Sequence, residues 1–215
     1  MRDVAFLDSL DRKVAPGNAA LIVVDVQNDF CAEEGVFGKT GNDLSMVREM
    51  LPRLKLLIQG ARSAGVPVIF VQAIYDPVYL PAVWYERNAR LDFEVPRCLS
   101  DSWGADFYEV GPLNGETVVR KHRYSAFVDT NLDLILRSRQ IQTVIVTGVA
   151  TNICVESTSR DAFMRDYYVA LVDDGSAAYS REQHQATLTN IAIGFGVVTT
   201  VDEVLDAWKA LAGNY

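Results

Sequence analysis

Cysteine and histidine are scarce in this 215-residue chain, which contains three cysteines and two histidines. Cys31, Cys98 and Cys154 are odd in number and far apart, and no two of them form a CxxC pair. This pattern argues against a disulfide framework or a structural zinc site and favours the reducing cytoplasm. We interpret Cys31 and Cys98 as packing thiols. His122 and His184 are too far apart in sequence to indicate a histidine-based metal site, so we expect no metal and no other cofactor.

Basic residues are outnumbered by acidic ones. The chain has 20 lysines and arginines against 28 aspartates and glutamates, and its net charge is −8 at pH 7. This charge repels nucleic acids and anionic membranes, so we expect neither as a partner. Residues 1–20 contain no continuous hydrophobic run, which predicts neither a signal peptide nor a transmembrane span. No GxGxxG or GxxxxGKS/T motif follows an apolar run, so nucleotide binding has no support.

Apolar residues, at 49%, and charged residues, at 22%, occur in the proportions of an ordinary globular protein. Because a chain of this length fits one sizeable core, residues 1–215 are predicted to form a single domain. Apolar runs of strand length recur at residues 20–26, 67–72, 117–121, 143–149, 169–174 and 196–200. Helical patterns follow at about 44–64, 130–139, 180–192 and 201–212, and a further helix is expected to carry Cys154.

Apolar strands separated by helices are typical of a parallel sheet that is covered on both faces. The pattern therefore predicts an α/β fold with a doubly wound, mainly parallel six-stranded sheet and helices on both faces. Asp129 or Thr130 is the expected N-cap of the helix at 130–139. In such folds, ligands bind at the carboxyl ends of the strands.

Residues 73–116 break this alternation, because they show little periodicity. An irregular stretch of this length is usually functional or ordered by a partner. It is rich in large aromatic rings: Tyr75, Tyr79, Trp84, Tyr85, Phe93, Trp103, Phe107 and Tyr108. Exposed on a monomer, these rings would form a sticky surface. We interpret the segment as part pocket wall and part subunit contact, and a plain covering layer over the sheet is an equal alternative.

Three reactive side chains follow three of the predicted strands. Asp25 ends the first strand, Lys121 ends the third, and Cys154 follows the fourth, in the turn GVATNICVE (148–156). Each alone has an ordinary explanation, as a loop cap, a solvated charge or a small buried hydrophobe. Together, at one edge of a parallel sheet, they would supply a base, a cation and a nucleophile.

The turn itself is expected to activate the cysteine. With Thr151 or Asn152 as the N-cap, Cys154 would lie in the first turn of a helix, near unsatisfied N–H groups and the positive end of the helix dipole. These groups and the ammonium of Lys121 should lower the thiol pKa. The same N–H groups could bind the oxyanion formed when a carbonyl is attacked, and Asp25 could accept the thiol proton.

A cysteine–histidine pair is the weaker hypothesis. His122 follows Lys121 along the same strand and should face the opposite way. His184 has polar neighbours in its helix and is expected to be solvated. Asp173 and Asp174 could form a carboxylate pair, but helix capping explains them equally well.

These residues resemble the isochorismatase-like cysteine hydrolases, which include nicotinamidases, N-carbamoylsarcosine amidohydrolase and ureidoacrylate amidohydrolase. The resemblance spans about residues 18–200 and rests on ALIVVDVQNDF, a strand that ends in lysine, and GVATNICVESTSRDAF. It implies the doubly wound sheet and a catalytic triad of Cys154, Asp25 and Lys121. It also implies a cis peptide bond between Val149 and Ala150, which would place the N–H of Ala150 beside that of Cys154 in an oxyanion hole.

Two departures narrow the choice within the family. The segment VQAIYDPVYLPAVW lacks the histidines that the metal-binding nicotinamidases carry there, and isochorismatases proper lack the nucleophilic cysteine that this chain has. RKHRYSAFVDTNLDLILRSR is most similar to the ureidoacrylate amidohydrolases. In those enzymes, the segment after the second strand resembles Gln-Asn-Gly-Trp. This chain has Gln72, Ala73, Ile74 and Tyr75 there, so the resemblance does not identify ureidoacrylate as its substrate.

The residues and the resemblance together predict a cysteine amidohydrolase that cleaves a C–N bond of a small carbamoyl (ureido) or carboxamide compound through a thioester and releases ammonia. The alternatives are a nicotinamidase-type amidase without the histidine metal site, or a catalytically idle redox-sensing or assembly protein. Candidate substrate-binding residues, each also explicable by packing or capping, are Gln27, Phe30, Tyr75, Asn88, Tyr124 and Asn152. Arg87 or Arg90 could pair with a substrate carboxylate, although a solvated surface charge is the favoured interpretation. A homodimer or homotetramer is expected.

Overall fold

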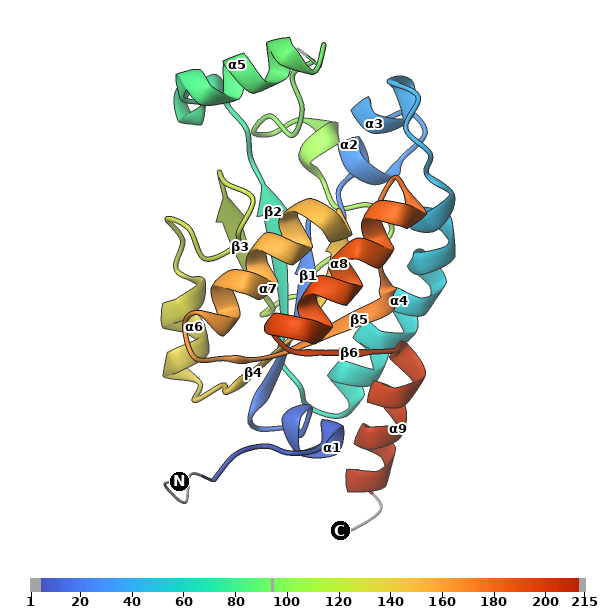
Figure 1. The fold of residues 1–215 in the computed structure, drawn as a ribbon, viewed down its shortest axis with the longest axis vertical. Helices are drawn as coiled ribbons and strands as arrows, with labels where there is room; N and C mark the ends of the chain where they lie inside the picture. Colours follow the sequence, from blue (N-terminus) through green and yellow to red (C-terminus); the bar gives the residue numbers. More distant parts are fainter. Residues whose placement is uncertain (1–4, 94, 213–215) are drawn as a thin grey trace.

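The centre of the molecule is a six-stranded sheet. The computed structural model describes residues 5–93 and 95–212. The strands are β1 (Ala19–Val24), β2 (Val68–Ala73), β3 (Thr117–Lys121), β4 (Thr143–Val149), β5 (Tyr168–Ala177) and β6 (Val197–Thr199). Neighbouring strands are all parallel, and their order is β3-β2-β1-β4-β5-β6 (Figure 1). The predicted α/β class is confirmed.

The strand order makes the sheet doubly wound. From β1 the chain adds β2 and β3 on one side, and it then returns to the other side of β1 to add β4, β5 and β6. β1 and β4 pair directly, from Ala19 with Thr143 to Val24 with Gly148. Their carboxyl ends mark the reversal of the winding, which is where sheets of this type bind ligands.

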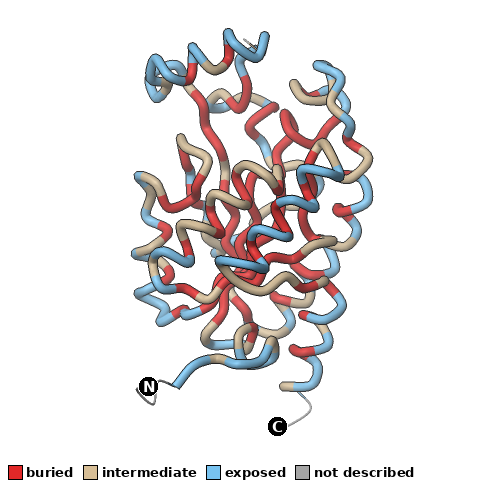
Figure 2. Tube along the Cα trace, viewed as in Figure 1, coloured by how far each residue is buried: buried red, intermediate tan, exposed pale blue. Residues whose placement is uncertain are grey.

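Helices cover both faces of the sheet. One face packs against α4 (Ser45–Ser63) and α9 (Val201–Ala212), and the other against α6 (Leu132–Ser138), α7 (Glu156–Phe163) and α8 (Arg181–Gly194). All side chains of β1 are buried, and successive ones, such as Leu21 and Ile22, enter the two opposite cores because side chains alternate along a strand. Figure 2 shows the buried part of the trace concentrated in these central strands.

Shorter elements gather at the carboxyl ends of the strands, at the top of Figure 1. They are α2 (Asn28–Cys31), α3 (Val36–Lys39), η1 (Pro77–Tyr79), α5 (Ala82–Arg90), η2 (Trp103–Ala105) and η3 (Thr151–Val155), the last a turn of π-helix. α1 (Leu10–Lys13) lies at the opposite end of the molecule, near both chain ends. The end that ligands are expected to reach is therefore the one built from short, irregular pieces.

Two predictions about helices are corrected. The segment 73–116 is not wholly irregular, because α5 lies within it, and its two buried residues, Trp84 and Asn88, are too few to give a clear apolar stripe. α6 begins later than predicted, and neither Asp129 nor Thr130 is its N-cap. Asp129 has a φ of 55°, in the left-handed region, whereas N-cap residues are typically extended.

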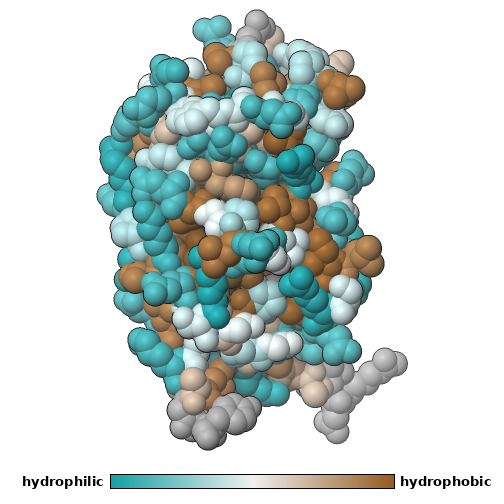
Figure 3. Space-filling model, turned by 180° about the vertical axis from the view of Figure 1, so that it is seen from behind, coloured by the Kyte–Doolittle hydropathy of each residue, from teal (hydrophilic) through white to brown (hydrophobic). Residues whose placement is uncertain are grey.

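The surface mixes polar and apolar residues. On the face opposite to that of Figure 1, hydrophobic residues lie among hydrophilic ones near the middle of the molecule (Figure 3). Exposed large apolar side chains also occur in the segment 73–116, at Val78, Tyr79, Val83, Tyr85, Leu91 and Trp103. Within the described ranges, no helix combines the length and the apolar character needed to span a lipid bilayer.

Candidate active site

Asp25, Lys121 and Cys154 meet at the carboxyl edge of the sheet. Lys121 Nζ lies 2.7 Å from Asp25 Oδ2 and 3.5 Å from Cys154 Sγ. Asp25 directly follows β1 with a φ of 52°, Lys121 is the last residue of β3, and Cys154 lies in η3 after β4. All three side chains are buried. The fold thus brings together the three residues that the sequence singles out.

The pKa values of the three groups are set mainly by burial. Burial raises the pKa of Asp25 above 3.8, and the facing ammonium of Lys121 only partly opposes this. Burial alone would lower the pKa of Lys121, but the charges of Asp25 and Cys154 hold it well above 10.5. Burial raises the pKa of the Cys154 thiol to about 12 despite the nearby Lys121 ammonium. The prediction of a lowered thiol pKa is therefore wrong, because burial outweighs the favourable charge.

The turn before the cysteine approaches β1 very closely. Gly148 has a φ of +106°, and a Cβ atom at this position would lie 2.1 Å from the carbonyl oxygen of Val24, so only glycine fits. The peptide bond between Val149 and Ala150, in the same turn, is cis. The carbonyl of Ala150 accepts hydrogen bonds from the N–H groups of Ile153 (3.0 Å) and Val155 (3.3 Å), and the second of these is the wide bond of a π-turn.

The predicted helix caps before Cys154 are also corrected. η3 has no side-chain cap, because the side chains of Thr151 and Asn152 turn toward α8 instead. The Thr151 hydroxyl lies 2.9 Å from His184 Nδ1, and Asn152 donates to Gln183 Oε1 at 3.1 Å. His184 is buried rather than solvated, and its Nε2 lies 2.7 Å from Asp173 Oδ1. Hydrogen bonds to α8 therefore fix the position of the turn that carries the Cys154 thiol.

The remaining polar candidates have structural partners. His122 Nδ1 lies 2.8 Å from the carbonyl oxygen of Ile74, and its ring stacks on Tyr79 with a centroid distance of 3.7 Å. Among the described residues, neither histidine forms a hydrogen bond with Cys154. Asp174 accepts the N–H of Val201 at the start of α9, which is the helix-capping alternative for that residue.

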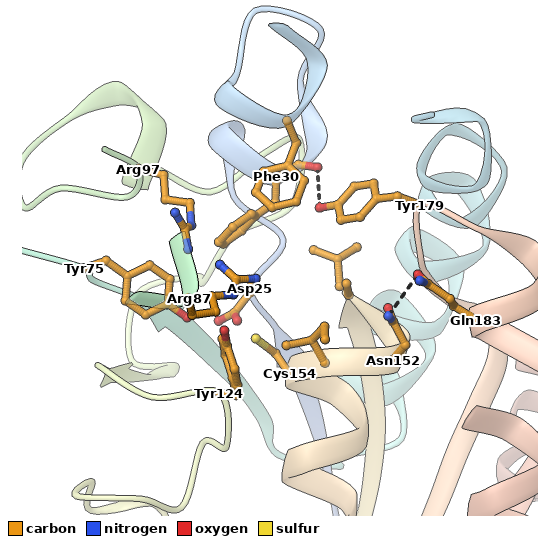
Figure 4. Close-up of a pocket in the computed structure, with 14 residues that line it drawn as sticks. Asp25, Phe30, Tyr75, Arg87, Arg97, Tyr124, Asn152, Cys154, Tyr179 and Gln183 are labelled. Carbon is orange, nitrogen blue, oxygen red and sulfur yellow. Dashed lines mark hydrogen bonds between the residues drawn. The ribbon is translucent and has the colours of Figure 1, made fainter. Parts of the chain in front are cut away.

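A cavity of about 100 Å³ is lined by two of the three catalytic candidates, Asp25 and Cys154 (Figure 4). Such a volume suits a small ligand, since an engineered apolar cavity of ~150 Å³ takes up benzene. Its walls combine aromatic rings with an equal number of charged or amide side chains: Asp25, Phe30, Phe37, Tyr75, Arg87, Arg97, Tyr124, Val149, Ala150, Asn152, Ile153, Cys154, Tyr179 and Gln183. Four of the six predicted substrate-binding residues, Phe30, Tyr75, Tyr124 and Asn152, are in this set.

The other two predicted substrate-binding residues lie elsewhere. Gln27 is fully buried, and its amide donates to the carbonyl oxygens of Ala73 and Ala105, both at 2.9 Å, so it ties the segment 73–116 to β2. Asn88 accepts a hydrogen bond from Arg87 and lines a neighbouring cavity. Arg90 is exposed and pairs with Glu86, as expected of a surface charge.

Sequence reasoning missed several residues of the cavity wall. Tyr179 follows β5, so its place at a strand end could have indicated it; its hydroxyl donates to the carbonyl oxygen of Phe30 (Figure 4). Gln183 lies in the first turn of α8, and its partner Asn152 was a candidate. Phe37 and Arg97 carry no such signal, because Phe37 lies on the short helix α3 and Arg97 in an irregular loop, and neither follows a strand.

Cys31 and Cys98 fit the interpretation as packing thiols. Both are unpaired, buried in the same core, and burial raises the pKa of each thiol. In the part of the chain that the structure describes, no cluster of three or more His, Cys, Asp or Glu side chains could hold a metal ion.

Comparison with known proteins extends these observations. The chain matches the family model of the Isochorismatase domain over residues 19–203. It is 37% identical over 205 residues to the ureidoacrylate amidohydrolase RutB of Pseudomonas syringae pv. syringae, covering 89% of this chain and 84% of that protein. The enzyme of the same name from Serratia proteamaculans is 38% identical over 210 residues, covering 91% and 85%.

Solved structures with a similar fold include hydrolases of the same kind. A cysteine hydrolase from Pseudomonas syringae pv. phaseolicola has a TM-score of 0.80 at 30% identity and covers 92% of this chain and 95% of its own. N-carbamoylsarcosine amidase from Thermoplasma acidophilum has a TM-score of 0.69 at 28% identity, with 86% and 97% coverage. With a family model that matches most of its length, the chain belongs to the isochorismatase family.

Proposed function

We propose that the protein is a cysteine amidohydrolase that cleaves a C–N bond of a small carbamoyl (ureido) or carboxamide compound through a thioester intermediate and releases ammonia. The observation that carries the proposal is the contact of Lys121 Nζ with both Asp25 (2.7 Å) and Cys154 (3.5 Å), two residues that line a small cavity. The names of the relatives, ureidoacrylate amidohydrolase and N-carbamoylsarcosine amidase, support the same class of reaction.

The first half of the reaction begins with a proton transfer. Because the raised pKa keeps the Cys154 thiol protonated at neutral pH, Asp25 accepts its proton as the sulfur attacks the carbonyl carbon. The Lys121 ammonium stabilises the developing thiolate. The backbone N–H groups of Ala150 and Cys154 hold the oxyanion. Asp25 then gives its proton to the departing ammonia, and the acyl group stays on Cys154 as a thioester.

The second half is hydrolysis of the thioester. Asp25 removes a proton from water as the water oxygen attacks, and the C–S bond breaks to restore the thiol. A carboxamide yields a carboxylic acid. A ureido compound yields a carbamate, which decomposes to an amine and carbon dioxide.

Ammonia release tests the proposal. The panel comprises ureidoacrylate, N-carbamoylsarcosine, biuret and nicotinamide, so that it separates ureido substrates from the nicotinamide of the amidase alternative. We expect turnover that falls by at least ~10³-fold in Cys154→Ser. Cys31→Ser, at a buried cysteine outside the site, is the matched control and should retain turnover. A Cys154→Ser variant that kept most of the activity would overturn the mechanism.

A redox-sensing role gains no support from the site. Sensor thiols have low pKa values and are exposed to solvent. Cys154 is buried, and its pKa is raised to about 12. A fully buried carboxylate that faces the lysine suits a proton-transfer role instead.

A further inference from the structure

Two arginines from the segment 73–116 reach the cavity. Arg97 has only 7% of its surface exposed, Arg87 is half-buried, and both belong to the same lining as Cys154. Both guanidinium groups point toward the cavity in Figure 4. The mechanism proposed above uses neither of them.

Within the described residues, no carboxylate forms a salt bridge with either arginine. Arg97 Cζ lies 4.8 Å from the ring centre of Phe93 and 5.6 Å from that of Tyr75, and Arg87 donates only to the neutral amide of Asn88 at 3.0 Å. Burial lowers the pKa of Arg97, and the nearby charge of Arg87 lowers it as well, but a guanidinium stays protonated in proteins. Among the described residues, these two cations, one of them buried, thus have no carboxylate partner, and Asp25, the carboxylate in the cavity lining, is paired with Lys121 instead. Such an arrangement favours an anionic ligand.

The contacts of Tyr75 and Lys121 set an upper limit on the distance between Arg97 and Cys154. The ring centre of Tyr75 is 5.6 Å from Arg97 Cζ and 5.9 Å from Lys121 Nζ, so these cations are separated by at most the sum of the two distances. Lys121 Nζ is in turn 3.5 Å from Cys154 Sγ. Because Arg87, Arg97 and Cys154 line one small cavity, a molecule bound there would have its carbonyl carbon about 3–3.5 Å from the sulfur and an anionic group at the guanidinium. The aromatic walls would pack against its middle.

We propose that Arg97, together with Arg87, binds a carboxylate of the substrate. The inference rests on the proposed function and specifies its substrate class, namely small acids that carry a terminal carbamoyl or carboxamide group, in preference to their neutral amides. A guanidinium matches a carboxylate with two parallel hydrogen bonds, which gives orientation as well as attraction.

We call Arg97 and Arg87 the carboxylate clamp. Alkylation of Cys154 by a matched pair of reagents tests this clamp without knowledge of the natural substrate. N-iodoacetylglycine carries a carboxylate, and N-iodoacetylglycinamide is its neutral counterpart. In both, the sulfur displaces iodide as an S–C bond forms, and Asp25 takes the thiol proton. Rates at pH 7.5 are measured by peptide mass spectrometry, with Cys154→Ser as the blank. We expect wild type to prefer the acid by about tenfold or more, relative to a neutral model thiol.

Variants assign the preference to the arginines. Arg97→Met and Arg87→Met should each lower the ratio of acid to amide rates, and Arg97→Lys should restore part of it, since the charge returns without the planar fork. Arg90→Met is the matched control and should leave the ratio unchanged, because Arg90 is exposed on α5, the helix that also carries Arg87. Because unfolded protein would react with both reagents without preference, the ratios are compared only among variants whose circular dichroism and unfolding transition match those of the wild type.

The outcomes separate the clamp from the proposed function. Rapid labelling of Cys154 with no preference for the acid, or a wild-type ratio in Arg97→Met, would overturn the clamp and leave the cysteine nucleophile standing. If Cys154 reacts no faster than Cys31 and Cys98 with either reagent, the nucleophile is wrong and the clamp falls with it. A preference lost in Arg97→Met and kept in Arg90→Met supports the assignment.

Discussion

At the scale of single residues, the proposed mechanism makes Asp25 a buried base whose proton affinity decides when Cys154 can react. The two oxygens of its carboxylate are shielded from water, and its one charged partner among the described residues is the Lys121 ammonium. Removing either member would strand a buried charge, which typically costs about 3–5 kcal/mol. Truncation of either side chain would therefore change both the stability of the fold and the reactivity of Cys154. The pH dependence of the Cys154 alkylation rate in the wild type avoids this problem.

The rate of Cys154 alkylation by iodoacetamide should follow the ionisation of Asp25. Burial raises the pKa of Asp25, so the rate should fall on the acid side with a midpoint above pH 3.8. The thiol pKa is raised to about 12, so the thiol stays protonated and the rate should be nearly flat between pH 7 and 9. A free thiol with a pKa near 8.5 would react faster as the pH rises through this range. Asp25→Asn should lower the rate at pH 7 by about 10²-fold or more.

The control for this profile is the same measurement on a small model thiol. A wild-type rate that rises through pH 7–9 in parallel with the model thiol would show that Asp25 is not the acceptor of the proton. An Asp25→Asn variant with an unchanged rate would lead to the same conclusion.

At the scale of elements, the turn η3 depends on α8 for its position. His184 lies between the Thr151 hydroxyl (2.9 Å) and Asp173 (2.7 Å) and is buried. His184→Leu keeps the size of the side chain but leaves the Thr151 hydroxyl without this partner, which should cost about 1–3 kcal/mol in the free energy of unfolding. Because the turn carries Cys154, kcat should fall while KM changes little. Urea denaturation and steady-state kinetics measure the two effects.

Two variants make this prediction specific. His184→Gln retains a polar group and should recover part of kcat, which a purely space-filling role would not require. Thr189→Ala, at an exposed residue of the same helix, should change stability by no more than about 0.5 kcal/mol. Unchanged unfolding and unchanged kcat in His184→Leu would contradict a positioning role for the histidine.

The same elements show what sequence can and cannot predict. Fully apolar runs identify the strands, and the strand ends identify Asp25 and Lys121. Along α8, His184 is the first of a buried series, His184, Thr187, Leu188 and Ile191, with helical spacing, so its burial could have been read from the sequence. The π-turn and the raised pKa of Cys154 could not, because both depend on how η3 packs against β1 and α8.

At the scale of the whole molecule, we propose that the segment 73–116 forms a subunit contact. It exposes Val83 and Tyr85 on α5 and Trp103 on η2, each more than half exposed, although patches of this kind are usually covered. Sedimentation velocity should detect a homodimer or homotetramer at micromolar concentration. Val83→Glu should shift the protein toward the monomer, because an unpaired charge in an interface is costly. Ile193→Glu, at an exposed apolar residue of α8, should leave the assembly intact.

A monomeric wild type over the whole concentration range would contradict the subunit contact. The segment would then be the covering layer that the sequence left as an equal alternative. Substrate identity is hidden from the sequence for a related reason, since Arg97, on an irregular loop, and Phe37, on the short helix α3, reach the cavity only through tertiary packing.

The strand order described above also has a consequence for the synthesis of the chain on the ribosome. The central strand β1 emerges early and can pair with β2, but its other neighbour, β4, is made only after β3 and α6. Until then one edge of β1 stays open, and open edges invite pairing with other nascent chains. Cys154 lies in η3, directly after the strand that closes this edge. A newly made chain therefore contains the proposed nucleophile only after the strand that covers this edge has been synthesised.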